Sequence, residues 1–542
     1  MPEKYKPGLI LPPDTCEGMK HGFDQLVKAI RPTLGPFPRS VVYERSFRNK
    51  MPEFLDDGGV IARRIIQLKD RDADVGAMFL RHVLWEVRES AGDGTATAAV
   101  LFQAVFEQGL RFITAGGNAM RLNHYLVKGL QLILQELDKM TMPIQGRQSL
   151  AQLAQTICQD AELADMMGEI LDILGEYGGL EIGEDYGRGV RREYIEGATW
   201  PIASTASEYN TGQDMAKKVI DEPAILISDL EIQDPKLLVP ILEECVRAGQ
   251  RKLVLLAGNF SENTIHMVQV INQDPARFQL LAVKTPGGIP DDQVHNMEDI
   301  AILTGGKPRI KAAGDTLEGF RSEHLGHARQ VWASKEYLGI IHGKGDPMLQ
   351  RSYLDQLKHA HRSANEKEVR QRLQKRLAKF WNGSANLFVG GINKNETDAR
   401  KEVAERTLSL LRGALRDGVL PGGGTALLAC KSILQTRLSG TSEPEAAAAN
   451  RILVKALEEP IRTLLTNAGY DDSEILAEIK KSPPGSGFDV ISANIVNVVE
   501  AGILDVASVV KEAVHAAVSS AGLALTTYVI VLRKNPEESA KP

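Results

Sequence analysis

The chain has 542 residues, of which 43% are hydrophobic, 25% charged and 5% aromatic, and at roughly 150 residues per domain this length predicts about three or four domains. The 64 basic and 70 acidic residues give a formal net charge of -6, which disfavours a nucleic-acid-binding surface. The 49 Gly and 25 Pro follow no repeat, which excludes a collagenous or low-complexity chain.

The start of the chain and its cysteines bear on the cellular compartment. The first seven residues, Met-Pro-Glu-Lys-Tyr-Lys-Pro, contain no apolar run and no small-residue cleavage site, so we expect no signal peptide. The histidines are scattered, without the spacing of a helical metal site. The four cysteines form no C-x-x-C pair, which argues against a zinc site or a disulfide framework and predicts a soluble cytoplasmic protein; they are Cys16, Cys158, Cys245 and Cys430.

The first part of the chain is predicted to be helical, and the middle part is predicted to be α/β. Between about residues 15 and 140, apolar side chains recur at helical spacing, for example at 75–86 and 98–110. In the middle, short β-type runs alternate with helical ones, which predicts βαβ units and a separate domain with a mixed or parallel sheet. The expected strands are 224–230, 252–258 and 278–284, with helices at 236–248 and 262–271.

The last third returns to the helical texture. Residues 354–380 carry Lys, Arg and Glu on most faces, which predicts a solvated helix or helical hairpin. Helical patterns follow from about 402 to the end, for example at 447–465 and 495–532. The most apolar stretch, 513–532, contains small and polar residues that suit an interior helix better than a membrane span. We therefore expect a discontinuous architecture, with a helical base from both chain ends and an α/β insertion.

Four short glycine-containing loops carry the chemical signal. They stand at 33–36, 55–59, 91–97 and 421–425. Glycines before a helix leave backbone N–H groups exposed at its positive end, where proteins hold phosphates. Asp93 in such a loop is suited to hold Mg²⁺. No Gly-Lys-Ser/Thr follows, so this is not a Walker A loop. Each loop alone is better explained as a turn with an N-cap, with Asp14 and Asp57 as capping candidates, but the four together favour a nucleotide site.

In chain order these motifs resemble the chaperonin family. Thr-Leu-Gly-Pro, Asp-Gly, Ala-Gly-Asp-Gly-Thr-x-Thr, Gly-Gly-Gly and Ala-Gly-Ile-Leu-Asp follow one another as in a divergent member, closest to the group I (GroEL-type) branch, over nearly the whole chain. The resemblance implies a multidomain α and α/β fold. Its parts would be a mainly α equatorial domain (1–139 and 417–542), two intermediate segments (140–195 and 385–416) and an apical α/β domain (196–384).

The resemblance also implies ATP and Mg²⁺ as cofactors, with K⁺ as a further cation. Asp93 corresponds to the metal ligand, Asp57 stands near the γ-phosphate, and Asp505 stands on the ribose side. At 488–491, Phe-Asp-Val-Ile replaces the Tyr-Asn-Ala-Ala of the family, which leaves base selectivity open. The cofactor-binding residues implied in this way are Thr33, Leu34, Gly35, Pro36, Asp93, Gly94, Thr95, Ala96, Thr97, Gly422, Gly423, Asp489, Val490, Ile491 and Asp505.

The main departure concerns hydrolysis. Where the family has an aspartate that orients the attacking water, counting from the flanking glycines puts Arg406. A cation cannot accept the proton of the water, although it could pair with the γ-phosphate. Asp57 and the adjacent Glu405 are the catalytic candidates, although neighbouring helix residues point about 100° apart. In the simplest alternative, Glu402 and Arg406 form a surface ion pair. We expect ATP binding to be more secure than turnover.

The face that binds clients and lid in the family is altered as well. Ser204, Glu208 and Gln269 are polar at positions on this face. The candidates that remain could form an exposed apolar patch or could equally be ordinary core residues. They are Tyr209, Val239, Leu242, Ile265 and Val270.

Two hypotheses lead. The first is an ATP-dependent chaperonin that forms a homo-oligomeric ring, with edge pairing by the strand-like segment 40–44 between neighbouring subunits. Its partners would be non-native proteins and a separate, small lid co-chaperonin, with no nucleic acid and no membrane. The second is a chaperonin-derived nucleotide-binding scaffold with little ATPase activity. A small-molecule phosphotransferase is weaker, because no second substrate pocket is signalled.

Overall fold

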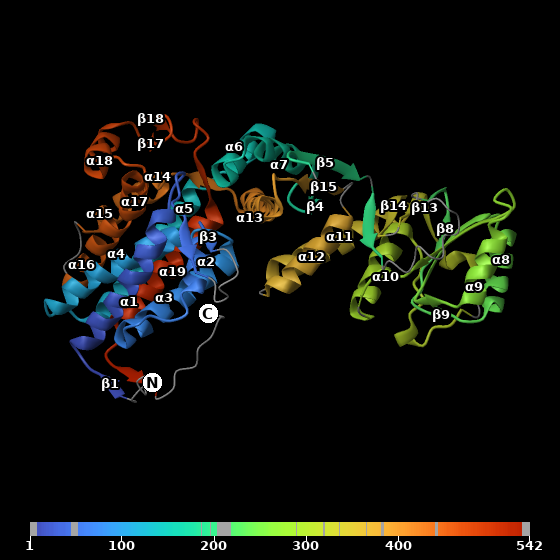
Figure 1. Cartoon of the computed structure of the whole chain (residues 1–542), viewed down its shortest axis with the longest axis horizontal. Coiled ribbons are helices and arrows are strands. Elements are labelled where there is room, and N and C mark those ends of the chain that lie inside the picture. The colour runs from blue at the N-terminus through green and yellow to red at the C-terminus, as the bar shows by residue number, and fades with distance from the viewer. Residues whose placement is uncertain are drawn as a thin grey trace. The chain divides into compact units, whose positions relative to one another are not determined.

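The structure is a computed structural model that describes residues 8–44, 52–185, 187–195, 197–202, 218–288, 290–317, 320–334, 336–364, 366–380, 384–438 and 443–533. It divides into two compact units (Figure 1). The helical unit consists of Met1–Glu176 and Asn393–Pro542, and the α/β unit consists of Tyr177–Ile392. A helical unit from both chain ends and an α/β unit from the middle agree with the predicted fold class. The finer division into five segments stays a prediction.

The helical unit is built on its N-terminal and C-terminal helices together. The last long helix, α19, packs against α3, α4 and α5 (Figure 1). The helices are α1 (Asp14–Ile30), η1 (Arg31–Thr33), α2 (Gly58–Arg64), α3 (Arg71–Ala91), α4 (Thr95–Thr114), α5 (Ala119–Met140), α6 (Arg147–Cys158), α7 (Ala161–Leu174), α13 (Lys394–Asp417), α14 (Thr425–Ala429), α15 (Lys431–Leu438), α16 (Pro444–Ala456), α17 (Glu459–Asn467), α18 (Asp472–Lys481) and α19 (Ala507–Leu525).

Small residues explain how α19 fits inside this unit. Ala513, Ala517 and Ala521 are fully buried, so the helix lies close to its neighbours without large side chains between them. A Cβ added at Gly109 of α4 would lie 2.3 Å from Leu525. The apolar stretch 513–532 is therefore largely an interior helix, as predicted. Among the described residues, no helix is both long and apolar enough to cross a membrane.

Short antiparallel strand pairs complete the helical unit. They correct the prediction of a helical pattern at 495–532, because residues 494–506 contribute two strands and α19 begins only at 507. The pairs are β1 (Gly8–Ile10) with β20 (Ile530–Leu532), β2 (Val41–Tyr43) with β3 (Glu53–Leu55), β16 (Val419–Pro421) with β19 (Leu504–Val506), and β17 (Ser486–Asp489) with β18 (Asn494–Asn497).

The α/β unit contains a seven-stranded mixed sheet. Its order is β12-β10-β8-β13-β14-β6, with β7 also paired to β13. β8, β10 and β12 run parallel, and the other pairings are antiparallel. The sheet strands are β6 (Ala198–Pro201), β7 (Lys218–Asp221), β8 (Ala224–Leu226), β10 (Lys252–Ala257), β12 (Gln279–Lys284), β13 (Gly326–Ala333) and β14 (Tyr337–Gly343).

The predicted βαβ alternation is confirmed in this sheet. The three expected strands are β8, β10 and β12, and the expected helix at 262–271 is α9 (Glu262–Ile271). The remaining elements cover the sheet or form smaller pairings. They are β4 (Gly179–Glu184), β5 (Val190–Ile195) and β15 (Ser384–Val389) in a three-stranded sheet, β9 (Glu231–Ile232) with β11 (Asn259–Phe260), η3 (Pro235–Leu237), α8 (Leu238–Arg247), α10 (Pro290–Thr304), η4 (Lys311–Ala313), η5 (Ser322–His324), α11 (Pro347–Ser363) and α12 (Lys367–Lys379).

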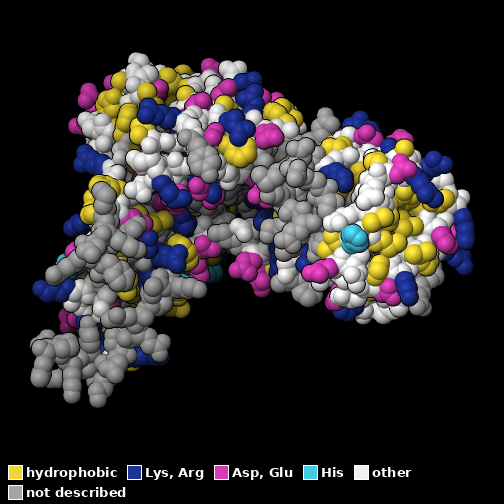
Figure 2. All heavy atoms as spheres, turned by 45° about the vertical axis from the view of Figure 1, so that its right-hand side comes forward, with side chains coloured by type: hydrophobic (Ala, Val, Ile, Leu, Met, Phe, Trp, Pro, Cys, Tyr) yellow, Lys and Arg dark blue, Asp and Glu magenta, His cyan; other side chains and the backbone are white. Residues whose placement is uncertain are grey.

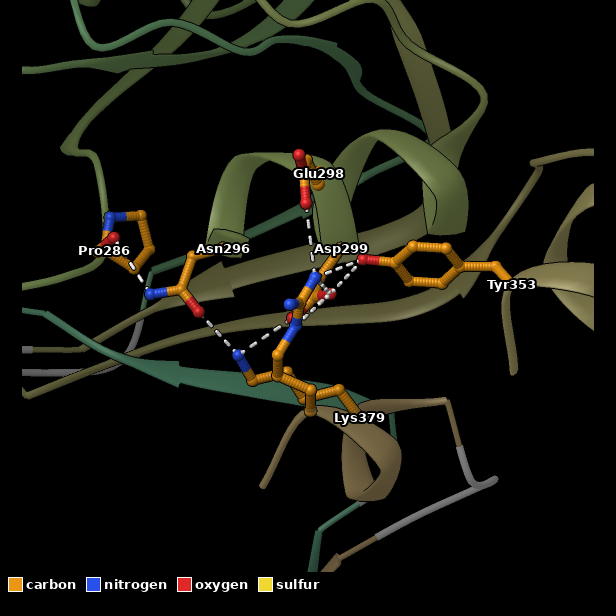
Figure 3. Close-up of polar contacts among 7 residues, drawn as sticks. Pro286, Asn296, Glu298, Asp299, Tyr353 and Lys379 are labelled. Atoms are coloured by element: carbon orange, nitrogen blue, oxygen red, sulfur yellow. Dashed lines mark hydrogen bonds and ion pairs between the residues drawn. The ribbon is translucent and has the colours of Figure 1, made fainter. Parts of the chain in front are cut away.

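The charged stretch 354–380 forms the hairpin of α11 and α12, but it is not wholly solvated as predicted. Asp299 of α10 is 0% exposed and accepts hydrogen bonds from Arg376, Lys379 and Tyr353 (Figure 3). The Arg376 Nη2 to Asp299 Oδ1 distance is 3.0 Å, and the Lys379 Nζ to Asp299 Oδ2 distance is 3.4 Å. Lys379 also donates to Asn296, at 2.6 Å. Arg376 and Lys379 of the hairpin thus both form ion pairs with one buried carboxylate.

Candidate functional site

Asp57 caps the start of helix α2. Its Oδ1 accepts hydrogen bonds from the backbone N–H groups of Gly59 and Val60, at 2.8 and 2.9 Å. The predicted capping role of Asp57 is therefore confirmed. The other capping candidate, Asp14, is instead the first residue of α1, whose N-cap position is Pro13 without a side-chain hydrogen bond.

An arginine that the sequence analysis missed holds the same carboxylate. Arg88, in the last turn of α3, donates from Nε to both oxygens of Asp57, at 3.1 and 3.3 Å. Its guanidinium lies over the ring of Trp85, with the Cζ atom 5.4 Å from the ring centroid. The chain approaches closely here, because a Cβ added at Gly59 would lie 2.5 Å from Arg88 Cδ. The two residues stand far apart in sequence, and only the folded positions of α2 and α3 reveal the pair.

The loop with Asp93 joins α3 to α4. Gly92 and Gly94 adopt left-handed φ values of 79° and 87°, which favour glycine. Gly94 is the N-cap residue of α4 and donates its N–H to Asp93 Oδ1, at 2.7 Å. Asp93 is exposed at the surface, but the surrounding protein partly desolvates its carboxyl group and so raises its pKa, and the positive charge of Arg406 opposes this rise. Thr95, in the first turn of α4, is buried; Ala96 and Thr97 are half-buried.

The loop at 33–36 is fixed from two sides. Asn467 donates to the carbonyl oxygens of Arg31 and Leu34, at 2.9 and 2.8 Å. Gln159, between α6 and α7, donates to the carbonyl oxygen of Pro36, at 2.6 Å. The hydroxyl of Thr33 donates to the carbonyl of Ile30, and Gly35 has a φ of 109°. These hydrogen bonds tie the loop after η1 to the end of α17 and to the connection between α6 and α7.

The glycine loop 422–424 lies beside Asp505. In the β16–β19 pair Leu420 stands opposite Asp505, and Gly422 donates its N–H to the carbonyl of Ile503, at 2.9 Å. Gly423 and Gly424 have φ values of 63° and 79°, and the Gly424 N–H hydrogen-bonds to the Asp505 carboxylate. The helix expected after this loop is broken at Cys430 into the short α14 and α15.

Residues from both ends of the chain meet in this place. Burial and the negative charge of Asp93 raise the pKa of Asp505 to about 7, so these two acids from distant segments interact. A Cβ added at Gly58, beside Asp57, would lie 3.0 Å from the Thr95 hydroxyl. The structure therefore brings together the loops at 55–59, 91–97 and 421–425 and Asp505.

The hairpin β17–β18 lies next to the loop 422–424, because a Cβ added at Gly487 would lie 2.6 Å from Thr425 Oγ1. Its three candidate residues differ in exposure. Asp489 accepts the N–H of Ile491, at 2.9 Å, and Ile491 is 74% exposed. Val490 is buried in an apolar cluster, so its backbone, rather than its side chain, is available to a ligand.

Arg406, and not Glu405, faces the acids of the site. From α13, Arg406 Nη1 lies 3.9 Å from Asp57 Oδ2. Glu405 is exposed and, within the part of the chain that the structure describes, makes no ion pair, because adjacent helix positions point about 100° apart. Glu402 lies 3.9 Å from Arg88 and does not pair with Arg406, which corrects the simplest alternative. The geometry does not support Glu405 as a catalytic residue.

The donor set fits Mg²⁺ only in combination with phosphates. Within the described ranges, no group of three or more His, Cys, Asp or Glu side chains could hold a metal ion. Asp93 offers a carboxylate with one oxygen engaged by Gly94, and carboxylate oxygens are the ligands that Mg²⁺ prefers. Mg²⁺ sites commonly use one or two carboxylates together with substrate phosphates and water. Asp93 would therefore hold the ion through its remaining oxygen.

The candidates for client binding lie on α8 and α9 of the α/β unit. Val239 and Val270 are 41% and 49% exposed, whereas Leu242 and Ile265 are half-buried and pack against the core of the sheet. Figure 2 shows apolar side chains gathered on the face of this unit that the view brings forward. Tyr209, together with Ser204 and Glu208, lies outside the described residues. Of the four described candidates, Val239 and Val270 thus belong to an exposed patch, and Leu242 and Ile265 belong to the core.

Comparison with known proteins points to one family. A sequence model of the TCP-1/cpn60 chaperonin family matches residues 194–535. A crystal structure of the chaperonin gp146 from bacteriophage EL 2 (Pseudomonas aeruginosa), in the presence of ATP-BeFx, is similar with a TM-score of 0.65 and 17% sequence identity. The match covers 97% of this chain and 99% of that chain. At this identity the likeness shows the fold, and the predicted chaperonin-type fold is confirmed.

Proposed function

Because the chain belongs to the TCP-1/cpn60 chaperonin family, we propose that it is an ATP-dependent chaperonin, a homo-oligomeric ring that binds non-native protein. The observation that carries the nucleotide part is the meeting of Asp57, Asp93 and Asp505 with glycine loops from both chain ends. The assignment to the group I branch is part of this proposal. All four cysteines are free thiols, which supports a reducing cytoplasm as the compartment.

In this proposal the nucleotide lies among the glycine loops. Backbone N–H groups of the loop 33–36 and of the first turn of α4 bind the phosphates. Asp93 holds Mg²⁺, which neutralises phosphate charge when bound, and K⁺ is a further cation. The loop 422–424 and Asp505 contact the ribose, and the hairpin at 489–491 lies on the base side. Asp57, fixed by its own cap and by Arg88, stands at the γ-phosphate end.

Client binding is proposed for the α8–α9 face. The exposed Val239 and Val270 support an apolar contact with unfolded chains, and the half-buried Leu242 and Ile265 would contribute from its floor. Tyr209 belongs to the same proposal through the family resemblance. A separate, small lid co-chaperonin is the second expected partner of this face.

A scaffold with little ATPase activity is the second candidate, and Arg406 favours it. The residue that faces Asp57 from α13 is a cation, which cannot accept a proton from an attacking water. Nucleotide would then stabilise the assembly and be turned over slowly. The two candidates share the nucleotide site, and the rate of hydrolysis is the measurement that separates them.

Ring assembly is supported by two short strand ribbons with exposed apolar pairs. Val42 and Phe54, opposite each other in β2–β3, are 56% and 69% exposed. Leu9 and Val531, opposite each other in β1–β20, are 66% and 71% exposed. Among the described residues each ribbon has only two strands, so its outer edges can pair with a neighbouring subunit.

Phe54→Glu is expected to shift the protein from a large ring towards smaller species. The substitution places a charge on an apolar surface that the contact between subunits would bury, and an unpaired buried charge is costly. Sedimentation velocity at micromolar concentration measures the outcome. Ile173→Glu, at a position 60% exposed on α7, is the matched control and should leave the ring intact. A wild-type protein that sediments as a 59.3 kDa monomer would contradict the ring.

Asp93→Ala is expected to weaken Mg-ATP binding at least tenfold and to remove its dependence on Mg²⁺. Without this carboxylate the phosphate charge would be met by backbone dipoles and arginines alone. Titration calorimetry with and without Mg²⁺ measures both effects. Asp172→Ala makes the same chemical change at an exposed position on α7 and should bind as wild type does. Equal binding by Asp93→Ala and wild type would show that the loop is only a structural turn.

A further inference from the structure

We propose that Arg88 and Arg406 form a guanidinium clamp that binds the terminal phosphate of a nucleoside triphosphate and makes the site prefer triphosphate over diphosphate. This inference rests on the proposed nucleotide site and names the residues that set its specificity. Arg88 lies on α3 and Arg406 on α13. Neither residue belongs to the glycine loops.

Both guanidinium groups converge on one carboxylate. Arg88 Nε lies 3.1 Å from Asp57 Oδ2, and Arg406 Nη1 lies 3.9 Å from the same oxygen. Asp57 stands beside the loop that holds Asp93, since a Cβ added at Gly58 would lie 3.0 Å from the Thr95 hydroxyl. The two cations therefore lie at the Asp57 end of the glycine loops, where the far end of a bound polyphosphate would lie.

Arg88 is held in place before any ligand binds. Its guanidinium lies over the ring of Trp85, with the Cζ atom 5.4 Å from the ring centroid. The guanidinium of Arg63 lies over the same ring, with its Cζ atom at 4.6 Å. Its stem runs against Gly59, where a Cβ would come within 2.5 Å of Cδ. A guanidinium fixed in this way loses little conformational entropy when it binds an oxyanion.

Both arginines of the clamp have N–H donors that could bind a phosphate. Arg406 Nε is buried without a hydrogen-bond partner in the part of the chain that the structure describes, and its only ion pair there is the 3.9 Å contact with Asp57. Among the same residues the terminal nitrogens of Arg88 make one long ion pair, 3.9 Å to the largely exposed Glu402. Buried donors are normally satisfied, and the planar fork of an arginine matches the oxygens of a phosphate.

The balance of charge explains why a third phosphate needs the clamp. Without the two arginines the terminal phosphate would approach the carboxylates of Asp57 and Asp93, and like charges at this range repel. With them, two positive charges face the two carboxylates, and Mg²⁺ held by Asp93 adds further positive charge. ADP does not reach this end of the site, so the clamp contributes to the binding of ATP and not to that of ADP.

The test compares the affinities of Mg-ATP and Mg-ADP for the full-length protein at fixed ionic strength. The variants are Arg88→Gln and Arg406→Gln, and the matched control is Arg400→Gln, which removes a guanidinium from the same helix α13, where it pairs with Asp160 between α6 and α7. We expect each clamp variant to lose ATP affinity by about tenfold or more, as for one charge-assisted hydrogen bond, and to bind ADP as wild type does. Arg406→Lys should recover part of the loss.

Each outcome decides the proposal. Unchanged ADP affinity shows that a variant is folded, and if Arg88→Gln fails to fold, Arg406→Gln alone gives the answer. Equal losses for ATP and ADP, or an ATP preference that survives both substitutions, would overturn the clamp while leaving the nucleotide site intact. A wild-type protein that binds neither nucleotide would overturn the proposed function, and the clamp with it.

Discussion

Asp299→Asn is expected to destabilise the α/β unit by about 3–5 kcal/mol, the cost of leaving buried charge without its partner. The side chain is 0% exposed and accepts from Arg376 Nε and Nη2, at 3.1 and 3.0 Å, and from Tyr353, at 2.9 Å (Figure 3). Asparagine has the same shape but carries no negative charge. It would also turn an amide NH₂ towards one of the cations, so Arg376 and Lys379 would lose their shared counter-ion.

The pKa shifts of the neighbouring side chains support a strong electrostatic role for Asp299. Burial raises the pKa of Tyr353, and the negative charge of Asp299 raises it further. Burial lowers the pKa of Lys379, and Asp299 opposes this. In the variant the ammonium of Lys379 would therefore lose its proton more readily, which limits the destabilisation at high pH.

Urea denaturation followed by tryptophan fluorescence measures the loss of stability. The matched control is Glu298→Gln, which touches the same Arg376 at 3.3 Å from a side chain that is 45% exposed. An exposed ion pair contributes about 1 kcal/mol or less, so this variant should unfold close to wild type. If Asp299→Asn also unfolds within that range, the network contributes packing but little electrostatic stability.

The sequence predicted those parts of the fold whose patterns are local. The helix at 262–271 and the strands β8, β10 and β12 follow from apolar periodicity and from helices that alternate with strands. The helical prediction for 495–506 is wrong, because the two strands there are short and are defined by their pairing partners rather than by a pattern of their own. The sequence also did not predict that Arg376 and Lys379 pair with a buried carboxylate. Only the folded position of Asp299 distinguishes such a buried ion pair from a solvated charged face.

In the candidate site, too, local motifs could be predicted from the sequence, whereas contacts formed only in the folded chain could not. The glycine loops and their acids were found because motif order and spacing are visible in the sequence. Arg88 was missed, because an arginine in the last turn of a helix is ordinarily explained by the helix dipole, and its partner Asp57 stands far earlier in the chain. Glu405 was named because it is adjacent in sequence to Arg406, but adjacent helix positions face different directions, and only Arg406 reaches the site.

Arg406→Asp is expected to raise the rate of ATP hydrolysis in a single turnover by about tenfold, less than the 10²–10⁴-fold that a positioned general base typically contributes. Position 406 already faces Asp57 and Asp93. An aspartate there is too short to reach Asp57, so it leaves the place of the guanidinium for a water molecule and offers a carboxylate to accept its proton. The gain is reduced because the variant also removes one of the two cations that face the terminal phosphate during the reaction.

Arg406→Asn is the control that isolates the base, since it removes the cation and opens the same space without a carboxylate. Asp57→Ala should lower the hydrolysis that remains, because it removes the acid at the γ-phosphate end of the site. Alanine at Glu402 or Glu405 should change little, since both side chains are exposed. Enzyme in excess over radiolabelled ATP, at a concentration well above each variant's dissociation constant for ATP, keeps weaker binding from masking the chemical step. If Arg406→Asn hydrolyses ATP as fast as Arg406→Asp, removal of the positive charge explains the gain, and general-base catalysis does not. If Glu405→Ala abolishes wild-type turnover, α13 must rotate during the reaction to bring Glu405 to the water.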